Sequence, residues 1–216
     1  MSEVNKNAKK KPMPKSMQML KAQTAGIYEK AWEASKKGEP IGWSTAIFPQ
    51  ELCETFGIPV LYPENNAASV SARHMGSELI QHAEGEMRYP INICSYARLN
   101  IALADKAQKD ELEWDKSEPY MPVPTFLCLA NNSCTQLMKW YENLSRNLDI
   151  PIFFMDCLYN YYEEEPKPHK IKYVRSQIEG NIKKMEEFFG NKFDWDRFEE
   201  VQRRSQINVK LFDEIV

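Results

Sequence analysis

The sequence lacks most of the short motifs that identify an enzyme directly. It contains no Gly-x-Gly-x-x-Gly and no Gly-x4-Gly-Lys-Ser/Thr, so neither a dinucleotide fingerprint nor a P-loop is present. It also lacks a Gly-x-Ser-x-Gly nucleophile elbow and the tight Cys-x2-Cys pairs of zinc and ferredoxin sites. The three histidines, His74, His82 and His169, have no ligand-like partners in the sequence. Common motif-based assignments are therefore excluded, and other residues must carry any chemistry.

Strong charge of one sign and long apolar runs are also missing. The net charge of −3 gives no reason to expect nucleic acid or an anionic membrane surface as a partner. No apolar run is long enough to span a bilayer, and the N-terminus has no apolar h-region of a secretory signal. We therefore expect a cytoplasmic protein with no membrane partner, whose five cysteines stay reduced or bind metal. The one basic stretch, within residues 1–15, is predicted to be a disordered tail.

Short apolar runs alternate with helical stretches once a first helix, predicted over residues 16–37, has ended. Strands that are short and apolar throughout indicate a parallel sheet covered on both faces. We therefore predict a doubly wound α/β lobe, Rossmann- or flavodoxin-like, over residues 38–160. Its strands are expected at residues 40–48, 58–62, 123–129 and 150–155, and its helices at 49–56, 67–84, 94–106 and 134–148.

A helical segment is predicted over residues 161–216. After an acidic, Pro-containing loop at residues 161–169, an amphipathic helix runs to Phe189 and ends at Gly190. Asp194 is a predicted cap for the next helix, whose apolar stripe continues to Ile215. The chain stops at Val216 in the middle of this stripe. We therefore expect a truncated chain, with a second lobe missing beyond it.

Four reactive side chains are predicted to lie at one edge of the sheet. Ligands of open parallel sheets bind beyond the carboxyl ends of the strands, where loops lead into helix N-termini. Ser44 comes late in the first strand, and Glu64 follows the second strand directly. Cys94 opens a helix after a short extended stretch, and Cys134 opens another helix after the third strand. This edge is therefore the predicted site.

The two helix-opening thiols suit metal binding for a physical reason. The partial positive charge and unpaired N–H groups of a helix N-terminus favour the thiolate over the thiol, and thiolates hold iron–sulfur clusters. Cys53 and Cys128 fit the role of small buried hydrophobes, because one lies on an apolar helix face and the other lies in the third strand. Cys157 follows the fourth strand, and its role stays open. The spacing of the cysteines alone matches no cluster signature.

Several blocks of sequence, in the same order, resemble the α subunits of 2-hydroxyacyl-CoA dehydratases, such as the lactoyl-CoA and 2-hydroxyglutaryl-CoA dehydratases. The wider family also contains benzoyl-CoA reductase subunits. The resemblance extends from about residue 40 to residue 216. It is carried by Gly42-Trp43-Ser44, Phe48-Pro49-Gln50-Glu51-Leu52-Cys53, Tyr62-Pro63-Glu64-Asn65-Asn66, Cys94-Ser95-Tyr96-Ala97-Arg98, Asn131-Asn132-Ser133-Cys134-Thr135-Gln136 and Phe193-Asp194-Trp195.

The resemblance implies subunits of two α/β lobes, between which three cysteines hold a [4Fe–4S] cluster. Cys94 and Cys134 match the first two ligand positions, and the third is expected outside this chain. The implied reaction is an oxygen-sensitive elimination of water from an (R)-2-hydroxyacyl-CoA, through a ketyl radical, to give an enoyl-CoA. The implied partners are a β subunit and a separate ATP-dependent iron–sulfur activator protein that delivers one electron.

The same resemblance, together with their predicted location, suggests roles for two further residues. Ser44 is predicted to donate a hydrogen bond to the thioester oxygen, and Glu64 to act as general base or to assist loss of hydroxide. Three alternatives remain at this stage. They are a benzoyl-CoA-reductase-type subunit, a truncated non-catalytic remnant of the family, and a flavodoxin-like binding domain in which all five cysteines are structural.

Overall fold

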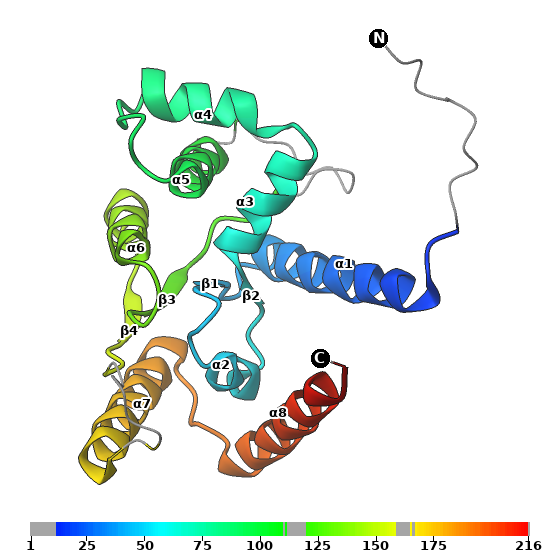
Figure 1. Ribbon diagram of the computed structural model, residues 1–216. Coiled ribbons are helices and arrows are strands. Elements are labelled where there is room, and N and C mark those ends of the chain that lie inside the picture. The colour runs from blue at the N-terminus through cyan, green and yellow to red at the C-terminus, as the bar shows by residue number, and fades with distance from the viewer. Residues whose placement is uncertain (1–11, 110, 112–119, 159–164, 166, 216) are drawn as a thin grey trace.

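The fold is built on a four-stranded parallel sheet with the order β2-β1-β3-β4. The computed structural model describes residues 12–109, 111, 120–158, 165 and 167–215 (Figure 1). This confirms the predicted α/β class, and the strand order is the flavodoxin-like one. The strands are β1 (Gly42–Ser44), β2 (Val60–Leu61), β3 (Phe126–Ala130) and β4 (Ile152–Met155).

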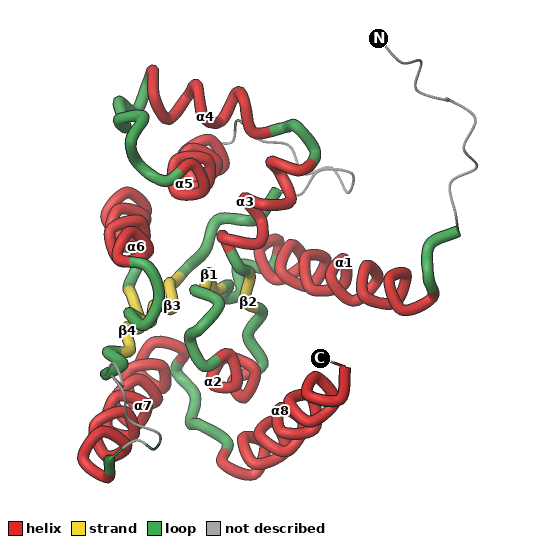
Figure 2. Tube along the Cα trace, viewed as in Figure 1, coloured by secondary structure: helices red, strands yellow, loops and turns green. Residues whose placement is uncertain are grey.

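Helices fill most of the remaining described chain and cover both faces of the sheet (Figures 1 and 2). One buried cluster joins α1, α3, α4, α5 and α6 to one face of the sheet, and a second joins α2 and α7 to the other. The helix α8 packs against α2. The helices are α1 (Lys15–Lys36), α2 (Gln50–Phe56), α3 (Pro63–Ala72), α4 (Gly76–Gly85), α5 (Ser95–Gln108), α6 (Thr135–Leu148), α7 (Pro168–Phe189) and α8 (Trp195–Ile215).

Local sequence signals set several helix ends where they were predicted. Gly57 and Gly190 follow α2 and α7 with φ values of 76° and 73°, a backbone region that favours glycine. The Asp194 carboxylate accepts a hydrogen bond of 2.9 Å from the N–H of Arg197 and so caps α8, as expected. None of the helices in the described residues is long and apolar enough to cross a membrane.

The single helix predicted over residues 67–84 is wrong, because the chain forms two helices there. The first, α3, begins at Pro63, whose ring suits the first helical turn. The break contains His74, which has a left-handed φ of 59°. After it, Gly76 lies so close to α5 that a Cβ at this position would be 2.9 Å from Cδ1 of Leu99. Packing of α4 onto α5 therefore breaks the helix at a point where the helical pattern of the sequence continues.

The strands are also shorter than predicted. The stretch predicted as a strand over residues 40–48 is extended in the sheet only at Gly42–Ser44, and β2 has just two residues. Residues 89–93, expected to be extended, form a turn. The predicted loop at 161–169 and the predicted tail at 1–15 lie mostly outside the described residues. The short strands leave the positions after β1 and β2 free to turn into helices at the carboxyl edge.

Candidate functional site

The carboxyl edge of the sheet brings the starts of α5 and α6 together. Cys94 and Cys134 occupy the N-cap positions of these two helices, as predicted. The backbone N–H of Cys94 donates a hydrogen bond of 3.2 Å to Oε1 of Gln136, the second residue of α6. Further along the two helices, the Trp140 indole N–H donates to Oδ1 of Asn100 at 3.0 Å, inside the core. The two cysteine-bearing helix starts are thereby held side by side.

The two thiols differ in their exposure. Cys94 is half-buried and packs against the core cluster on the α5 and α6 face of the sheet, whereas Cys134 is exposed. Both precede unpaired N–H groups of a helix first turn, which favours a bound anion or a thiolate. Among the described residues, no group of three or more Cys, His, Asp or Glu side chains is arranged to hold a metal ion. This edge therefore carries two thiols from neighbouring helices.

Glu64 lies in the first turn of α3, rather than in a loop after β2. Its Oε1 accepts a long hydrogen bond of 3.5 Å from the N–H of Ala46, just beyond β1. Burial raises the pKa of the Glu64 carboxyl, and backbone N–H groups of Glu64 and Ala46 act in the opposite direction. A carboxylate whose pKa is raised binds a proton more tightly than an exposed glutamate does. Glu64 is thus tied to the β1 edge and chemically suited to proton transfer.

Ser44 points to the other face of the sheet. It pairs in register with Cys128, whose side chain belongs to the cluster beneath α2 and α7. The Ser44 hydroxyl donates to the carbonyl oxygen of Thr45 at 2.9 Å, and the residue is only 1 % exposed. Glu64 and Cys94 belong to elements on the opposite face. Ser44 therefore shares the carboxyl edge with them but not their side of the sheet.

The remaining three cysteines belong to, or pack against, the buried cluster on the α2 and α7 face of the sheet. Cys53 and Cys128 are buried, with their sulfur atoms 3.8 Å apart, and burial raises the pKa of the Cys128 thiol well above its ordinary value. Cys157 is half-buried, and burial together with nearby Asp156 raises its pKa. Its backbone N–H donates to Oδ1 of Asn131 at 2.7 Å. Cys53 and Cys128 thus occupy the interior, in the manner of small hydrophobes.

Two surface hollows lie apart from this edge. One, of about 590 Å³, is bounded by α1, α2 and the α2–β2 connection, and another, of about 560 Å³, lies between α7 and the start of α8. Neither is lined by Ser44, Glu64, Cys94 or Cys134. The predicted site residues therefore sit on an edge of the lobe and outside these two hollows.

Comparison with protein families decides the identity of the lobe. The model of the family described as 2-hydroxyglutaryl-CoA dehydratase, D-component, matches residues 45–216. The chain belongs to this family. The match includes Glu64, Cys94 and Cys134, and it begins one residue after Ser44.

Curated relatives agree with the family assignment. The chain is 44 % identical, over 86 % of its length, to the (R)-2-hydroxyisocaproyl-CoA dehydratase alpha subunit of Clostridioides difficile. It is 40 % identical, over 97 % of its length, to the (R)-phenyllactyl-CoA dehydratase alpha subunit of Clostridium sporogenes. The matches cover 43 % and 49 % of these two relatives. The chain thus spans about half the length of the curated relatives it matches.

Sequence reasoning missed three residues of this region of the family fold. Gln136 and Tyr141 lie on α6, and only the packing of α6 against α5 and the sheet shows what they contact. His82, which has no ligand-like partner in the sequence, is buried, with Nε2 only 2.7 Å from Oδ2 of Asp105. The side-chain hydrogen bonds of Lys109 and His82 lower the pKa of Asp105, although burial acts against them. His82 therefore ties α4 to α5, and the sequence carries no local signal of this.

Proposed function

We propose that this chain is the cluster-holding lobe of the α subunit of a 2-hydroxyacyl-CoA dehydratase. The proposed complex removes water from an (R)-2-hydroxyacyl-CoA and releases an enoyl-CoA. The observation that carries the proposal is the pairing of Cys94 and Cys134 at adjoining helix starts, inside a region that matches the dehydratase family. The names of the relatives support a dehydratase subunit, and the word alpha in those names supports a second subunit.

The donor atoms at the carboxyl edge fit part of an iron–sulfur site. Thiolates are the ligands of [4Fe–4S] clusters, and Cys94 and Cys134 would supply two of them. A third cysteine would come from outside this chain, because the described residues offer no group of three ligands. When bound, such a cluster supplies one-electron transfer to the substrate. The hydrogen bond from Cys94 N–H to Gln136 holds the two ligand-bearing helices in place for it.

Glu64 is the proposed general base. The substrate must lose a proton from its β-carbon and a hydroxyl group from its α-carbon, and the family resemblance implies a ketyl radical that makes this β-proton acidic. A carboxylate with a raised pKa accepts such a proton more readily than an ordinary glutamate does. Ser44 is the proposed donor to the thioester oxygen. Because its hydroxyl is buried on the other side of the sheet from Glu64, this role requires the hydroxyl to turn away from the Thr45 carbonyl and to reach the substrate across the carboxyl edge.

The proposed partners supply what the described lobe does not hold. An ATP-dependent activator protein, which the family resemblance implies, is proposed as the electron source. This fits a sequence with neither a P-loop nor a dinucleotide fingerprint. A β subunit and a second α lobe are proposed to complete the pocket for the acyl-CoA. This agrees with the position of the four site residues outside the two hollows of about 590 and 560 Å³.

Metal analysis of cysteine variants tests the proposal. The chain is purified and reconstituted with ferrous iron and sulfide under anaerobic conditions, and its bound iron, sulfide and visible absorbance are measured. Cys94→Ser and Cys134→Ser should each lose most of the bound iron. Cys53→Ala, which removes a thiol buried elsewhere, should keep it. Equal iron in all four proteins would contradict the cluster assignment, and so would a wild-type chain that stays colourless when the lobe with the third cysteine is supplied. Either result would favour a non-catalytic remnant.

A further inference from the structure

Two oxygen atoms near the carboxyl edge are buried without a hydrogen-bond partner among the described residues. One is the hydroxyl oxygen of Tyr141, a residue of α6 that is completely buried. The other is Oε2 of Glu64, whose Oε1 accepts the long hydrogen bond from Ala46. Buried polar atoms in folded proteins nearly always have a partner, either from the protein or from ordered water. Two such atoms in one region point to a shared partner.

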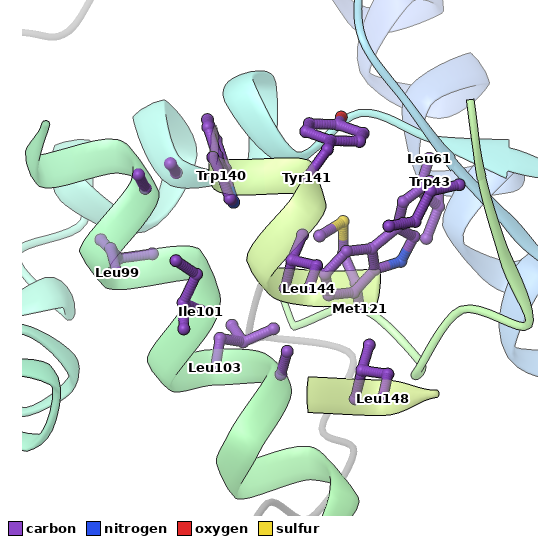
Figure 3. Close-up of a cluster of buried hydrophobic side chains, with 14 of the residues drawn as sticks. Trp43, Leu61, Leu99, Ile101, Leu103, Met121, Trp140, Tyr141, Leu144 and Leu148 are labelled. Atoms are coloured by element: carbon purple, nitrogen blue, oxygen red, sulfur yellow. The ribbon is translucent and has the colours of Figure 1, made fainter. Parts of the chain in front are cut away.

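Charge and packing place the two groups in the same region. Burial is the largest cause that raises the pKa of Tyr141. The carboxylate of Glu64 is the second, ahead of Cys128 and Tyr62. Figure 3 shows Tyr141 in one cluster with Trp43 and Leu61, the core residues of β1 and β2. The segments that follow these two strands carry Ala46 and Glu64. The Tyr141 hydroxyl is turned away from Leu144 in the same view.

We propose that Tyr141 is a positioning residue for Glu64 and acts through one bridging water molecule. The Tyr141 hydroxyl donates to the water, and the water donates to Oε2 of Glu64. Water suits this role because it can both accept and donate, and buried waters characteristically satisfy otherwise unpartnered polar groups. The bridge stabilises the charged carboxylate and fixes its orientation at the β1 edge. Tyr141 itself is enclosed in the core, so it acts through Glu64 and does not touch the substrate.

Glu64 is the carboxyl group among the titratable neighbours of Tyr141. Burial is the first cause that raises the pKa of both Tyr62 and Cys128, the other titratable groups near Tyr141, so both stay neutral. A hydrogen bond to the charged form of a carboxyl lowers its pKa, and its loss raises the pKa again. Removal of the Tyr141 hydroxyl should therefore raise the pKa of Glu64 further.

The test is a ¹³C NMR titration of the Glu64 side-chain carboxyl in the 216-residue chain. Glu64→Gln assigns the signal. In Tyr141→Phe, the pKa of Glu64 should rise by about one pH unit. Tyr62→Phe is the matched control, because it removes a hydroxyl that donates to Oε1 of Gln50 at 2.5 Å, and it should leave the pKa of Glu64 unchanged. An unchanged or lowered pKa of Glu64 in Tyr141→Phe overturns the inference.

A second measurement covers the case in which Tyr141→Phe does not fold. Glu64→Gln should then shift the ¹³C signal of the Tyr141 ring carbon that bears the hydroxyl, and no shift at that carbon overturns the bridge. The catalytic consequence rests on the proposed function. In a reconstituted dehydratase, Tyr141→Phe should move the rise of kcat with pH upward and leave KM unchanged. An inactive wild-type complex would count against the proposed function, whereas the NMR titration decides the role of Tyr141 by itself.

Discussion

A methyl group added at Gly42 tests how tightly β1, the strand that carries Ser44, is packed. An ideal Cβ at Gly42 would lie 2.6 Å from Cε2 and Cζ of Phe126 and 3.2 Å from Cγ2 of Val60. Phe126 cannot give way cheaply, because it is fully buried. Its ring centroid lies 5.5 Å from that of Phe153 and 5.1 Å from that of Phe189. Gly42→Ala should therefore strain the core beneath α7.

The expected magnitude follows from two opposing contributions. The Phe126 ring must move by about 1 Å to restore an ordinary carbon–carbon contact, and such overpacking costs about 1–3 kcal/mol. Alanine is favoured over glycine in a strand by about 0.5–1 kcal/mol, which offsets part of this cost. The two ranges leave a net fall in the free energy of unfolding of up to about 2.5 kcal/mol, and of about 1 kcal/mol at their midpoints, with a fall in Tm of about 2–4 °C for each kcal/mol.

Thermal unfolding followed by far-UV circular dichroism measures the effect. Gly180→Ala is the matched control, since Gly180 lies inside α7 and a Cβ there meets nothing within 4 Å. That change should raise the free energy of unfolding by about 0.5–1 kcal/mol through helix propensity alone. The packing argument is refuted if Gly42→Ala is as stable as the wild type or more stable.

Three further outcomes follow from burial at other positions. Burial raises the folded pKa of Glu64, so the stability that this group contributes is lost as pH rises through that pKa. Glu64→Gln should therefore raise Tm at pH 7, and the gain should disappear well below pH ~4.3, the unfolded value, where glutamate is protonated in both states; a lower Tm at pH 7 contradicts this. Asn181→Ala removes a donor to the Phe154 carbonyl at 2.9 Å and should cost about 1–3 kcal/mol in urea denaturation, whereas an unchanged midpoint argues against it. In the native protein, iodoacetamide should label exposed Cys134 and spare Cys128, because the Cys128 thiol is buried and its pKa is raised. Peptide mass spectrometry measures the labelling, and early labelling of Cys128 would contradict the prediction.

Helix ends were the most predictable part of the fold, because their signals are local. Glycine after α2 and α7 and an aspartate before α8 act through the backbone of their own turn. The single helix predicted over residues 67–84 failed for the opposite reason. Its break at His74 serves the packing of α4 on α5, in which Gly76 touches Leu99, and such a contact between distant residues leaves no mark on the local pattern.

Some features of the candidate site were also predictable from local sequence, and others were not. The placement of Cys94 and Cys134 at helix starts was predictable from the rule that loops at the carboxyl edge lead into helices. The contact partner of Cys94, Gln136, was not predictable, because it depends on how α6 is rotated against α5. Ser44 shows the limit most clearly. With only three residues in β1, the pairing of Ser44 with Cys128 decides which face its hydroxyl takes.

The sequence by itself determined the alternation of strands and helices, the identity of the capping residues and the two thiols that begin helices. These features depend on hydrophobic periodicity and on the chemistry of neighbouring residues along the chain. Only the tertiary structure decided that Ser44 and Glu64 lie on different sides of the sheet, and that Tyr141 is buried in the same region as Glu64. Strand register and helix rotation control these relations, and both result from contacts between residues far apart in the chain.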